Sequence, residues 1–440
     1  MSSNDSHASV AHLAAVETVD RRPPLRVALL GFGTVGAAVA RILVERPDLA
    51  DRVQLTHVFN RDVARKRASW VPSSVTWTED VDELFAASPD VVVEVIGGVD
   101  PAGAWVRRAL EQGACVVTAN KVLLAAQGPE LLHLAAARGV EIRFEAAVGG
   151  GVPVIQGVRE GLAGDNLRRV AGILNGTSNY VLSRMAAGGD DTMADVLADA
   201  RRLGYAEADP SADIDGDDAG AKLVVLGGIA FRRHLRLSDI PRRSIRPITA
   251  ADFRYARSLG CTIRQIALVE SRGEAFHAFV GPALVPLGSI FGRNEGANNV
   301  VTLVGQYGGE SSFSGAGAGG PATAVAVVSD LLALAQRRMG DRGEEWLPGT
   351  VVPPPARPYY LRFVVRDRPG ILAAIAAGLA RQGINLDAVL QEPGYPKDAL
   401  PFVITVEACE ESALRAALQD IGAADFHAEP PLALPMLLGV

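Results

Sequence analysis

Short apolar runs alternate with segments of helical periodicity over the first third of the chain. Such runs have the length and composition of buried strands. They predict strands at residues 25–30, 53–60, 91–97, 116–119 and 140–148, with helices that include 102–111 and 130–138. Strands that alternate with helices form a parallel sheet with helices on both faces. The pattern therefore predicts an α/β domain with a doubly wound parallel sheet over residues 25–150.

The pattern changes beyond residue 150. Residues 219–231 are apolar on every face apart from one lysine, which is typical of a helix buried on all sides. Residues 245–310 alternate short apolar runs with turns, as expected of an open sheet or a subunit interface. These segments predict a second domain of α+β type over residues 151–345.

A proline-rich segment and a compact βαββα pattern end the chain. Residues 346–357 predict a stiff linker, and residues 358–440 predict a small separate domain. Three prolines between residues 426 and 440 argue against a final strand there. At the other end of the chain, residues 1–24 are mostly polar and predict a disordered tail.

Composition argues against several classes of protein. A formal net charge of -7 disfavours nucleic acid or an anionic membrane as the main partner. Cys115, Cys261 and Cys409 lie far apart, which argues against a disulfide framework and a zinc site and fits a reducing compartment. No apolar run has transmembrane length, and the N-terminus lacks the pattern of a signal peptide. We therefore predict a cytoplasmic location.

A glycine-rich turn joins the first predicted strand to a helical segment. Gly31, Gly33 and Gly36 have the G-x-G-x-x-G spacing, and Thr34 and Val35 open the helix. Between a strand and a helix, these glycines permit a tight turn and the close approach of a pyrophosphate to the helix N-terminus. The turn predicts a Rossmann-type dinucleotide site, against the alternative of a turn that only packs helix on strand.

The end of the second predicted strand bears on which nucleotide is bound. An acidic residue there would bind the ribose hydroxyls of NAD, but the strand ends in Asn60 followed by Arg61. A guanidinium in this place favours the 2′-phosphate of NADP. NAD stays possible, because Asp62 follows and Arg61 could be a solvated surface residue.

Other residues stand where the rest of a cofactor would lie. Ligands bind beyond the carboxyl ends of parallel strands, so Ile96, Gly97 and Lys121 are expected beside the nicotinamide. Gly319 opens a later helix and is expected to approach the cofactor closely. The alternatives are a surface lysine in a loop and a flexible glycine linker.

The densest charge lies at residues 204–222. Six carboxylates fall between Glu207 and Asp218, and Lys222 is the only charged residue of the apolar segment that follows. A buried ammonium needs a partner, and Asp218 stands one helical turn earlier in the favoured order. In a dry cleft such a pair can hold a proton donor. The alternatives are a solvated acidic loop, a helix-capping aspartate, and a calcium loop, which fails because its required glycine and glutamate would be Asp218 and Val224.

A run of three glycines and a proline follows the fifth predicted strand. Residues 149–151 and Pro153 will not continue a strand, so several carbonyl oxygens lack ladder partners. With Glu145 nearby, such oxygens could hold a hard cation.

Five segments together resemble homoserine dehydrogenase, in the long form with a C-terminal ACT domain. They are GFGTVG, TANK, EAAVGGGVPVI, ILNGTSNY and GYAEADPSADIDGDDAGAK. The resemblance covers about residues 25–345 and 358–425. It implies a Rossmann domain, a substrate-binding, catalytic and dimerisation domain, and an ACT domain of ferredoxin-like βαββαβ fold. The implied reaction is the reversible NAD(P)H-dependent reduction of L-aspartate 4-semialdehyde to L-homoserine, on the pathway to threonine, methionine and isoleucine.

The resemblance also implies a role for each side chain of the site. Lys222 would give a proton to the carbonyl oxygen as hydride arrives, while Asp218 orients this lysine and the substrate. Lys121 matches a second active-site lysine of the family. Glu207 matches the carboxylate that holds the substrate ammonium, and Asp213 matches a further substrate-side carboxylate.

A monovalent cation, Na+, is implied in the same way. It would be bound by the glutamate and backbone carbonyls that match Glu145, Val148, Gly150 and Val152.

The ACT resemblance rests on residues 367–372 and 383–385 and implies feedback by an amino acid, L-threonine, in a homodimer or homotetramer. The alternative is a domain kept only for oligomerisation. Two other interpretations of the whole chain stay open. One is a non-catalytic sensor of nucleotide and amino acid, and the other is a dehydrogenase for another amino-acid aldehyde or keto acid.

Overall fold

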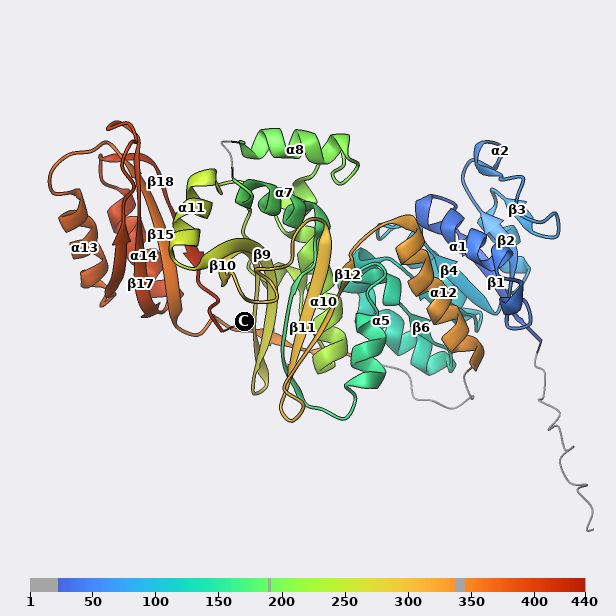
Figure 1. Ribbon diagram of the computed structural model, residues 1–440. Coiled ribbons are helices and arrows are strands. Elements are labelled where there is room, and N and C mark those ends of the chain that lie inside the picture. The colour runs from blue at the N-terminus through green and yellow to red at the C-terminus, as the bar shows by residue number, and fades with distance from the viewer. Residues whose placement is uncertain (1–22, 189–190, 337–344, 440) are drawn as a thin grey trace, which may run out of the picture.

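The computed structural model describes residues 23–188, 191–336 and 345–439. Three units follow one another along the molecule, with the N-terminal and C-terminal sheets at opposite ends and a mixed sheet between them (Figure 1). Within these described residues, no helix is both long enough and apolar enough to cross a membrane. The tail predicted over residues 1–24 lies almost wholly outside the described residues.

The N-terminal unit is a parallel sheet of six strands in the order β3-β2-β1-β4-β5-β6, which is the order of a dinucleotide-binding fold. Its strands are β1 (Leu25–Leu30), β2 (Val53–Phe59), β3 (Thr76–Thr78), β4 (Val91–Glu94), β5 (Cys115–Thr118) and β6 (Ile142–Arg143). Its helices are α1 (Thr34–Glu45), α2 (Val63–Lys66), α3 (Val81–Ala86), α4 (Ala102–Glu111) and α5 (Lys121–Arg138). The predicted doubly wound α/β architecture is confirmed.

Three boundaries predicted in this unit are wrong. β4 stops before Gly97, whose φ of +82° is incompatible with a strand. β6 has only two residues, because the chain turns into a 3-10 helix at Glu145–Ala147. α5 starts at Lys121 rather than at residue 130, because the side chain of Asn120 caps it.

The central unit is a sheet of six strands in the order β12-β11-β7-β9-β10-β14. Its strands are β7 (Leu167–Ile173), β9 (Cys261–Arg272), β10 (Ala275–Pro286), β11 (Asn298–Gly305), β12 (Glu310–Ala316) and β14 (Thr350–Val351). Its helices are α6 (Val154–Gln156), α7 (Gly176–Ala186), α8 (Met193–Arg202), α9 (Ser211–Ile214), α10 (Asp217–Phe231) and α11 (Ala250–Ser258). One further helix, α12 (Gly320–Gln336), returns to the N-terminal unit and packs on α1 (Figure 1).

α10 is the buried helix that the apolar segment predicts. Every residue from Ala219 to Ile229 is buried apart from Lys222. The helix packs against α5 of the N-terminal unit and against β7 and β9 of the central sheet. It begins after Gly216, whose φ is +89°, so none of the neighbouring aspartates serves as its cap.

The segment predicted as a linker is attached to the central unit. Trp346, its first residue, is 3% exposed. Its ring packs so closely on two glycines that a Cβ at Gly128 or Gly228 would lie 2.9 Å or 2.6 Å from it. β13 (Leu347–Pro348) then pairs with β8 (Arg233–His234), and β14 pairs with β10. The segment therefore follows the surface of the central unit.

The C-terminal unit is a sheet of four strands in the order β16-β17-β15-β18. It contains β15 (Arg357–Val365), α13 (Ile371–Arg381), β16 (Leu386–Leu390), β17 (Leu400–Cys409), α14 (Glu411–Gly422) and β18 (His427–Pro435). The argument against a final strand is wrong, because β18 pairs antiparallel with β15. It is an edge strand, and the register shifts between Arg362 and Val364, opposite Pro430 and Pro431, where a missing amide hydrogen is tolerated.

One face of this sheet packs on the central unit. Tyr360, Val403 and Leu434 share a hydrophobic core with α7, α8 and α11. Arg362 forms an ion pair with Asp252 of α11, and these side chains are 5% and 0% exposed. Tyr360 also donates a hydrogen bond of 2.9 Å to Asp252. A buried core as well as the connecting segment therefore holds the C-terminal unit.

Candidate active site

The glycine turn between β1 and α1 has the geometry of a pyrophosphate cradle. Gly31 has φ +105°, and a Cβ at Gly36 would lie 2.1 Å from the carbonyl oxygen of Gly31. The turn itself therefore requires both glycines. A Cβ at Gly33, by contrast, would meet nothing within 4 Å. Gly33 leaves open space at the N-terminus of α1, as a bound pyrophosphate requires.

The start of α12 lies against this turn. A Cβ at Gly320 would lie 2.9 Å from Cγ2 of Thr34, so the first turns of α12 and α1 are in contact. Gly319, with φ +114°, leads into α12. Two helix N-termini, each with a positive partial charge, therefore lie side by side where the phosphates would bind.

Arg61 follows β2 and is exposed to solvent. Its guanidinium has no hydrogen-bond or ion-pair partner in the part of the chain that the structure describes. The neighbouring Asp62 is occupied as the cap of α2, where it accepts a hydrogen bond of 3.0 Å from the amide of Arg65. Arg61 can therefore bind an anion without losing an existing contact.

Ile96 and Gly97 are held by a buried carboxylate that sequence analysis missed. Glu94 at the end of β4 is 0% exposed, and its Oε1 accepts hydrogen bonds of 2.9 Å and 3.0 Å from their amides. Its Oε2 accepts a hydrogen bond of 2.5 Å from Thr118 at the end of β5. A lone charge that closes an apolar strand was the signal that could have identified Glu94.

Two lysines converge on the carboxylate of Asp218. Nζ of Lys222 lies 2.8 Å from Oδ2, and Nζ of Lys121 lies 3.0 Å from Oδ1. Lys222 also donates to the carbonyl oxygen of Leu174 at 2.7 Å. The side chains of Lys222 and Asp218 are each 12% exposed, and that of Lys121 is 32% exposed. The structure thus brings together three predicted site residues from α5 and α10.

Asn175 completes this cluster and was missed as a site residue. Its Oδ1 caps α7 by accepting a hydrogen bond of 2.8 Å from the amide of Ser178. Its Nδ2 donates to Oδ1 of Asp213 at 2.6 Å and to Oδ2 of Asp218 at 2.8 Å. The bridge between two carboxylates arises only when α7, α9 and α10 pack together.

Other carboxylates of the acidic stretch are engaged elsewhere. Asp215 forms an ion pair with Arg246 at 2.9 Å, and Asp217 forms one with Arg242 at 2.7 Å. Glu207 is exposed in the loop after α8, and no described contact joins its carboxylate to the lysine–aspartate cluster. The crowding of charge in the sequence therefore does not mark one common site.

The two aspartates of the cluster differ in acidity. Burial acts to raise the pKa of Asp218, but the ammonium groups of Lys222 and Lys121 outweigh it and hold that pKa well below its usual range. Burial raises the pKa of Asp213, although its hydrogen bond from Asn175 opposes the change. At neutral pH Asp218 is therefore ionised and cannot readily take a proton from either lysine.

The glycine turn after β6 offers backbone oxygens to a cation. Gly150 has φ +58°, and the carbonyl oxygens of Val148 and Gly150 accept no hydrogen bond from the described residues. The carbonyl oxygen of Val152 accepts a hydrogen bond from one backbone amide. The carboxylate of Glu145 accepts hydrogen bonds of 2.9 Å and 2.7 Å from two backbone amides of α6. The described residues contain no group of three or more His, Cys, Asp and Glu side chains suited to a metal. A cation here would therefore rest mainly on carbonyl oxygens, which suits a hard ion.

Comparisons with known protein families match nearly the whole described chain. The family model described as "Homoserine dehydrogenase, NAD binding domain" matches residues 31–145, and that described as "Homoserine dehydrogenase" matches residues 153–332. The model described as "ACT domain" matches residues 359–426.

Similar proteins carry the same description. The homoserine dehydrogenase of Mycobacterium tuberculosis is 42% identical over 385 residues, which are 84% of this chain and 87% of that protein. That of Neisseria gonorrhoeae is 35% identical over 92% of this chain and 97% of its own length. The solved structure of a homoserine dehydrogenase from Thiobacillus denitrificans superposes with a TM-score of 0.86 at 34% identity, covering 94% of this chain and 98% of that one. A hyperthermophilic archaeal homoserine dehydrogenase in complex with NADPH has a TM-score of 0.60 at 26% identity, covering 72% of this chain and all of that one.

Proposed function

Because this chain belongs to the homoserine dehydrogenases, NAD(P)-dependent oxidoreductases that act on a CH–OH group, we propose that Lys222 protonates the carbonyl oxygen when L-aspartate 4-semialdehyde is reduced to L-homoserine. One observation carries this assignment. An ammonium has three N–H donors, and Lys222 uses one on Leu174 and one on Asp218. The third N–H is left for a substrate oxygen.

The cofactor, when bound, supplies a hydride to the carbonyl carbon. Lys222 donates a hydrogen bond to the carbonyl oxygen and stabilises the negative charge that develops there. Its proton then completes the hydroxyl group, and the amine regains a proton from solvent. In the reverse direction, the neutral amine of Lys222 accepts the hydroxyl proton of homoserine.

Asp218 positions both lysines. Its two carboxylate oxygens bind the ammonium groups of Lys222 and Lys121, which orients both groups toward the substrate. The lowered pKa of Asp218 keeps it an acceptor of hydrogen bonds and not of protons. Lys121, the first residue of α5, adds a second positive charge near the reacting oxygen.

Asp213 and Glu207 are the residues proposed to recognise the substrate ammonium. Asp213 shares the amide of Asn175 with Asp218, so it lies one side chain away from the reacting group. Glu207 is exposed and makes no competing ion pair with a described residue. Its loop is tied to the first turn of α7 by a hydrogen bond of 2.6 Å from Thr177 to the carbonyl of Tyr205.

NADP is the proposed cofactor, with NAD as a weaker alternative. The free guanidinium of Arg61 and the absence of an acidic residue at Asn60 support a site for the 2′-phosphate. The pyrophosphate would lie on the glycine turn and on the starts of α1 and α12. The residues assigned to the cofactor are Gly31, Gly33, Thr34, Val35, Gly36, Arg61, Ile96, Gly97, Lys121 and Gly319.

The glycine turn after β6 is the proposed site of Na+. The unpaired carbonyl oxygens of Val148 and Gly150 support it most directly. Glu145 and Val152 complete the set, although their oxygens already accept hydrogen bonds. The ion would stabilise the turn that lies between the N-terminal and central units.

The C-terminal unit is the proposed site of feedback by L-threonine. Its buried attachment to α11 supports a regulatory role, because a change in the sheet would act directly on the central unit. A homodimer or homotetramer is proposed as the functional assembly, and the open edge strand β12, whose residues alternate between exposed and half-buried, supports pairing with a second copy.

The test of the central proposal is Lys222→Met, assayed by nicotinamide absorbance with L-homoserine and NADP. We expect kcat to fall about 10²- to 10⁴-fold, because a positioned proton donor contributes that much, while the dissociation constant for NADP is unchanged. Lys397→Met is the matched control, since its side chain is 78% exposed in the C-terminal unit. Activity within tenfold of wild type in Lys222→Met would refute the assignment.

A further inference from the structure

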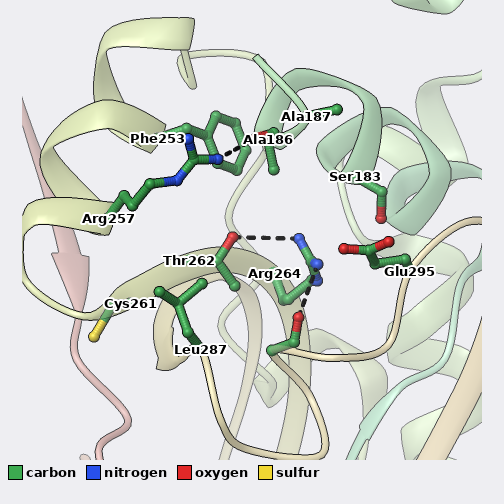
Figure 2. Close-up of a pocket in the computed structure, with 11 residues that line it drawn as sticks. Ser183, Ala186, Ala187, Phe253, Arg257, Cys261, Thr262, Arg264, Leu287 and Glu295 are labelled. Atoms are coloured by element: carbon green, nitrogen blue, oxygen red, sulfur yellow. Dashed lines mark hydrogen bonds between the residues drawn. The ribbon is translucent and has the colours of Figure 1, made fainter.

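A cavity lies at the other end of α7 from the lysine–aspartate cluster. It has a volume of about 180 Å³ and is lined by the last turn of α7, by α11, by the start of β9 and by the loop after β10 (Figure 2). None of the residues that line it belongs to the proposed active site. Its charged side chains are Arg257, Arg264 and Glu295, and its hydroxyl groups include that of Thr262.

Arg264 is a buried cation that makes no direct ion pair with a described residue. It is 1% exposed, and no carboxylate of the described residues lies within ion-pair distance of it. Its terminal nitrogens donate to the carbonyl oxygens of Ile263 and Gly292, each at 3.1 Å, while its Nε has no partner. Burial lowers its pKa to about 10. The charge of Glu295 opposes this effect only in part. A buried charge without a direct ion pair is unfavourable, and an anion in the cavity would reduce that penalty.

The other two charged side chains of the cavity, Arg257 and Glu295, have opposite signs. Arg257 approaches from α11 and donates to the carbonyl of Ala186 at 2.7 Å, which uses one of its five N–H groups. The carboxylate of Glu295 faces Arg264 across the cavity (Figure 2). It forms no ion pair with any described residue. The cavity therefore presents two guanidinium groups and one carboxylate.

We propose that this cavity binds a small α-amino acid, whose carboxylate contacts Arg264 and Arg257 and whose ammonium contacts Glu295. The volume of about 180 Å³ suits an amino acid with a short side chain. Phe253 and Leu287 supply apolar surface for that side chain. A simple carboxylate or phosphate would leave Glu295 unpaired beside a second negative charge. The inference is independent of the role proposed for Lys222.

Calorimetric titration of the full chain tests the proposal. The probes are glycine, L-alanine, L-serine and L-threonine, with propionate and L-alaninamide as compounds that each lack one of the two charges. We expect saturable binding of at least one amino acid and binding at least tenfold weaker for the two single-charge compounds. Arg257→Gln should weaken every carboxylate-bearing probe at least tenfold. Glu295→Gln should weaken the amino acids while leaving propionate unaffected or better bound.

Both substituted side chains are exposed, so the variants are expected to keep the fold. Arg293→Gln is the matched control, because Arg293 is exposed in the same loop but does not line the cavity. The proposal is overturned if wild type binds none of the amino acids. It is also overturned if both variants bind them as wild type does, because the ligand then occupies the C-terminal unit or the active site. A melting temperature several degrees lower for unliganded Glu295→Gln would make Glu295 a structural counter-ion and would likewise overturn it.

Discussion

Asn175 donates a hydrogen bond of 2.8 Å to Oδ2 of Asp218, the oxygen that also holds Lys222. The same amide group donates to Asp213, so one neutral side chain keeps two carboxylates in place. The cap of α7 fixes the position of that side chain. The orientation of the proposed proton donor therefore depends on a residue that does not touch it.

Asn175→Ser separates this role from helix capping. Serine caps a helix as well as asparagine does, but it cannot donate to both carboxylates. Loss of a hydrogen bond to a charged group costs ~1.5 to 3 kcal/mol, so kcat should fall roughly 10- to 100-fold. The pKa of Asp213, which Asn175 now holds down, should rise further. The acidic limb of the kcat/KM profile should therefore move to higher pH.

Thr192→Ala is the control for this variant. Thr192 forms the capping box of α8 and has no contact with the lysine–aspartate cluster. Its loss should lower the free energy of unfolding by about 1 kcal/mol without moving the pH profile. An acidic limb that stays in place in Asn175→Ser would contradict the positioning role.

Arg61→Ala should change the preference between cofactors. If Arg61 binds the 2′-phosphate, its loss removes a charge-assisted contact, and KM for NADP should rise roughly 10- to 100-fold. KM for NAD should stay within about twofold. Initial rates with each cofactor measure the effect, and Arg138→Ala, at the C-terminal end of α5, serves as control. Equal losses with both cofactors would indicate a structural role.

Arg362→Met should loosen the C-terminal unit. It leaves the carboxylate of Asp252 buried without a cation, which costs ~3 to 5 kcal/mol. The exposed pair of Arg368 and Asp425, with side chains 52% and 79% exposed, provides the control, and Arg368→Met should cost less than about 1 kcal/mol. Differential scanning calorimetry compares the transitions. Equal shifts in the two variants would show that the buried pair contributes no more than a surface pair.

His277 should make stability depend on pH. It is 2% exposed, and its Nε2 lies 3.0 Å from a guanidinium nitrogen of Arg357. Only a neutral imidazole can accept a hydrogen bond from this guanidinium. Burial, with help from Arg357, lowers the pKa of His277 to about 4, from an ordinary value near ~6.5. Because the pKa of His277 is lower in the folded than in the unfolded protein, its contribution to the free energy of unfolding is complete above the unfolded-state pKa. That contribution is lost as the pH falls from about 6.5 toward 4, by at most ~1.4 kcal/mol per pH unit.

Denaturant unfolding between these pH values checks the effect. His277→Gln should flatten the dependence in that interval, whereas His133→Gln, at an exposed position on α5, should not. A wild-type slope that persists in His277→Gln would assign the dependence to other groups.

Several features were determined by the sequence alone, because they depend on residues within one or two turns of one another. The glycine spacing from Gly31 to Gly36 predicts the cradle, since the turn is built from those residues only. The apolar segment around Lys222 predicts a buried helix, and the spacing of four residues from Asp218 predicts their ion pair. Alternation of strands and helices predicts the parallel sheet in the same local way.

Only the tertiary structure decided which distant groups meet. Asn175 and Asp218 are 43 residues apart, and Lys121 reaches the same carboxylate from another unit. Thr118 reaches the buried carboxylate of Glu94 only because β5 pairs with β4. The β18 strand formed despite its prolines because it lies at an edge and carries a register shift. Local patterns set the preferences of each segment, but hydrogen bonds and ion pairs between segments require the packing of helices against sheets to bring their partners within about 3 Å.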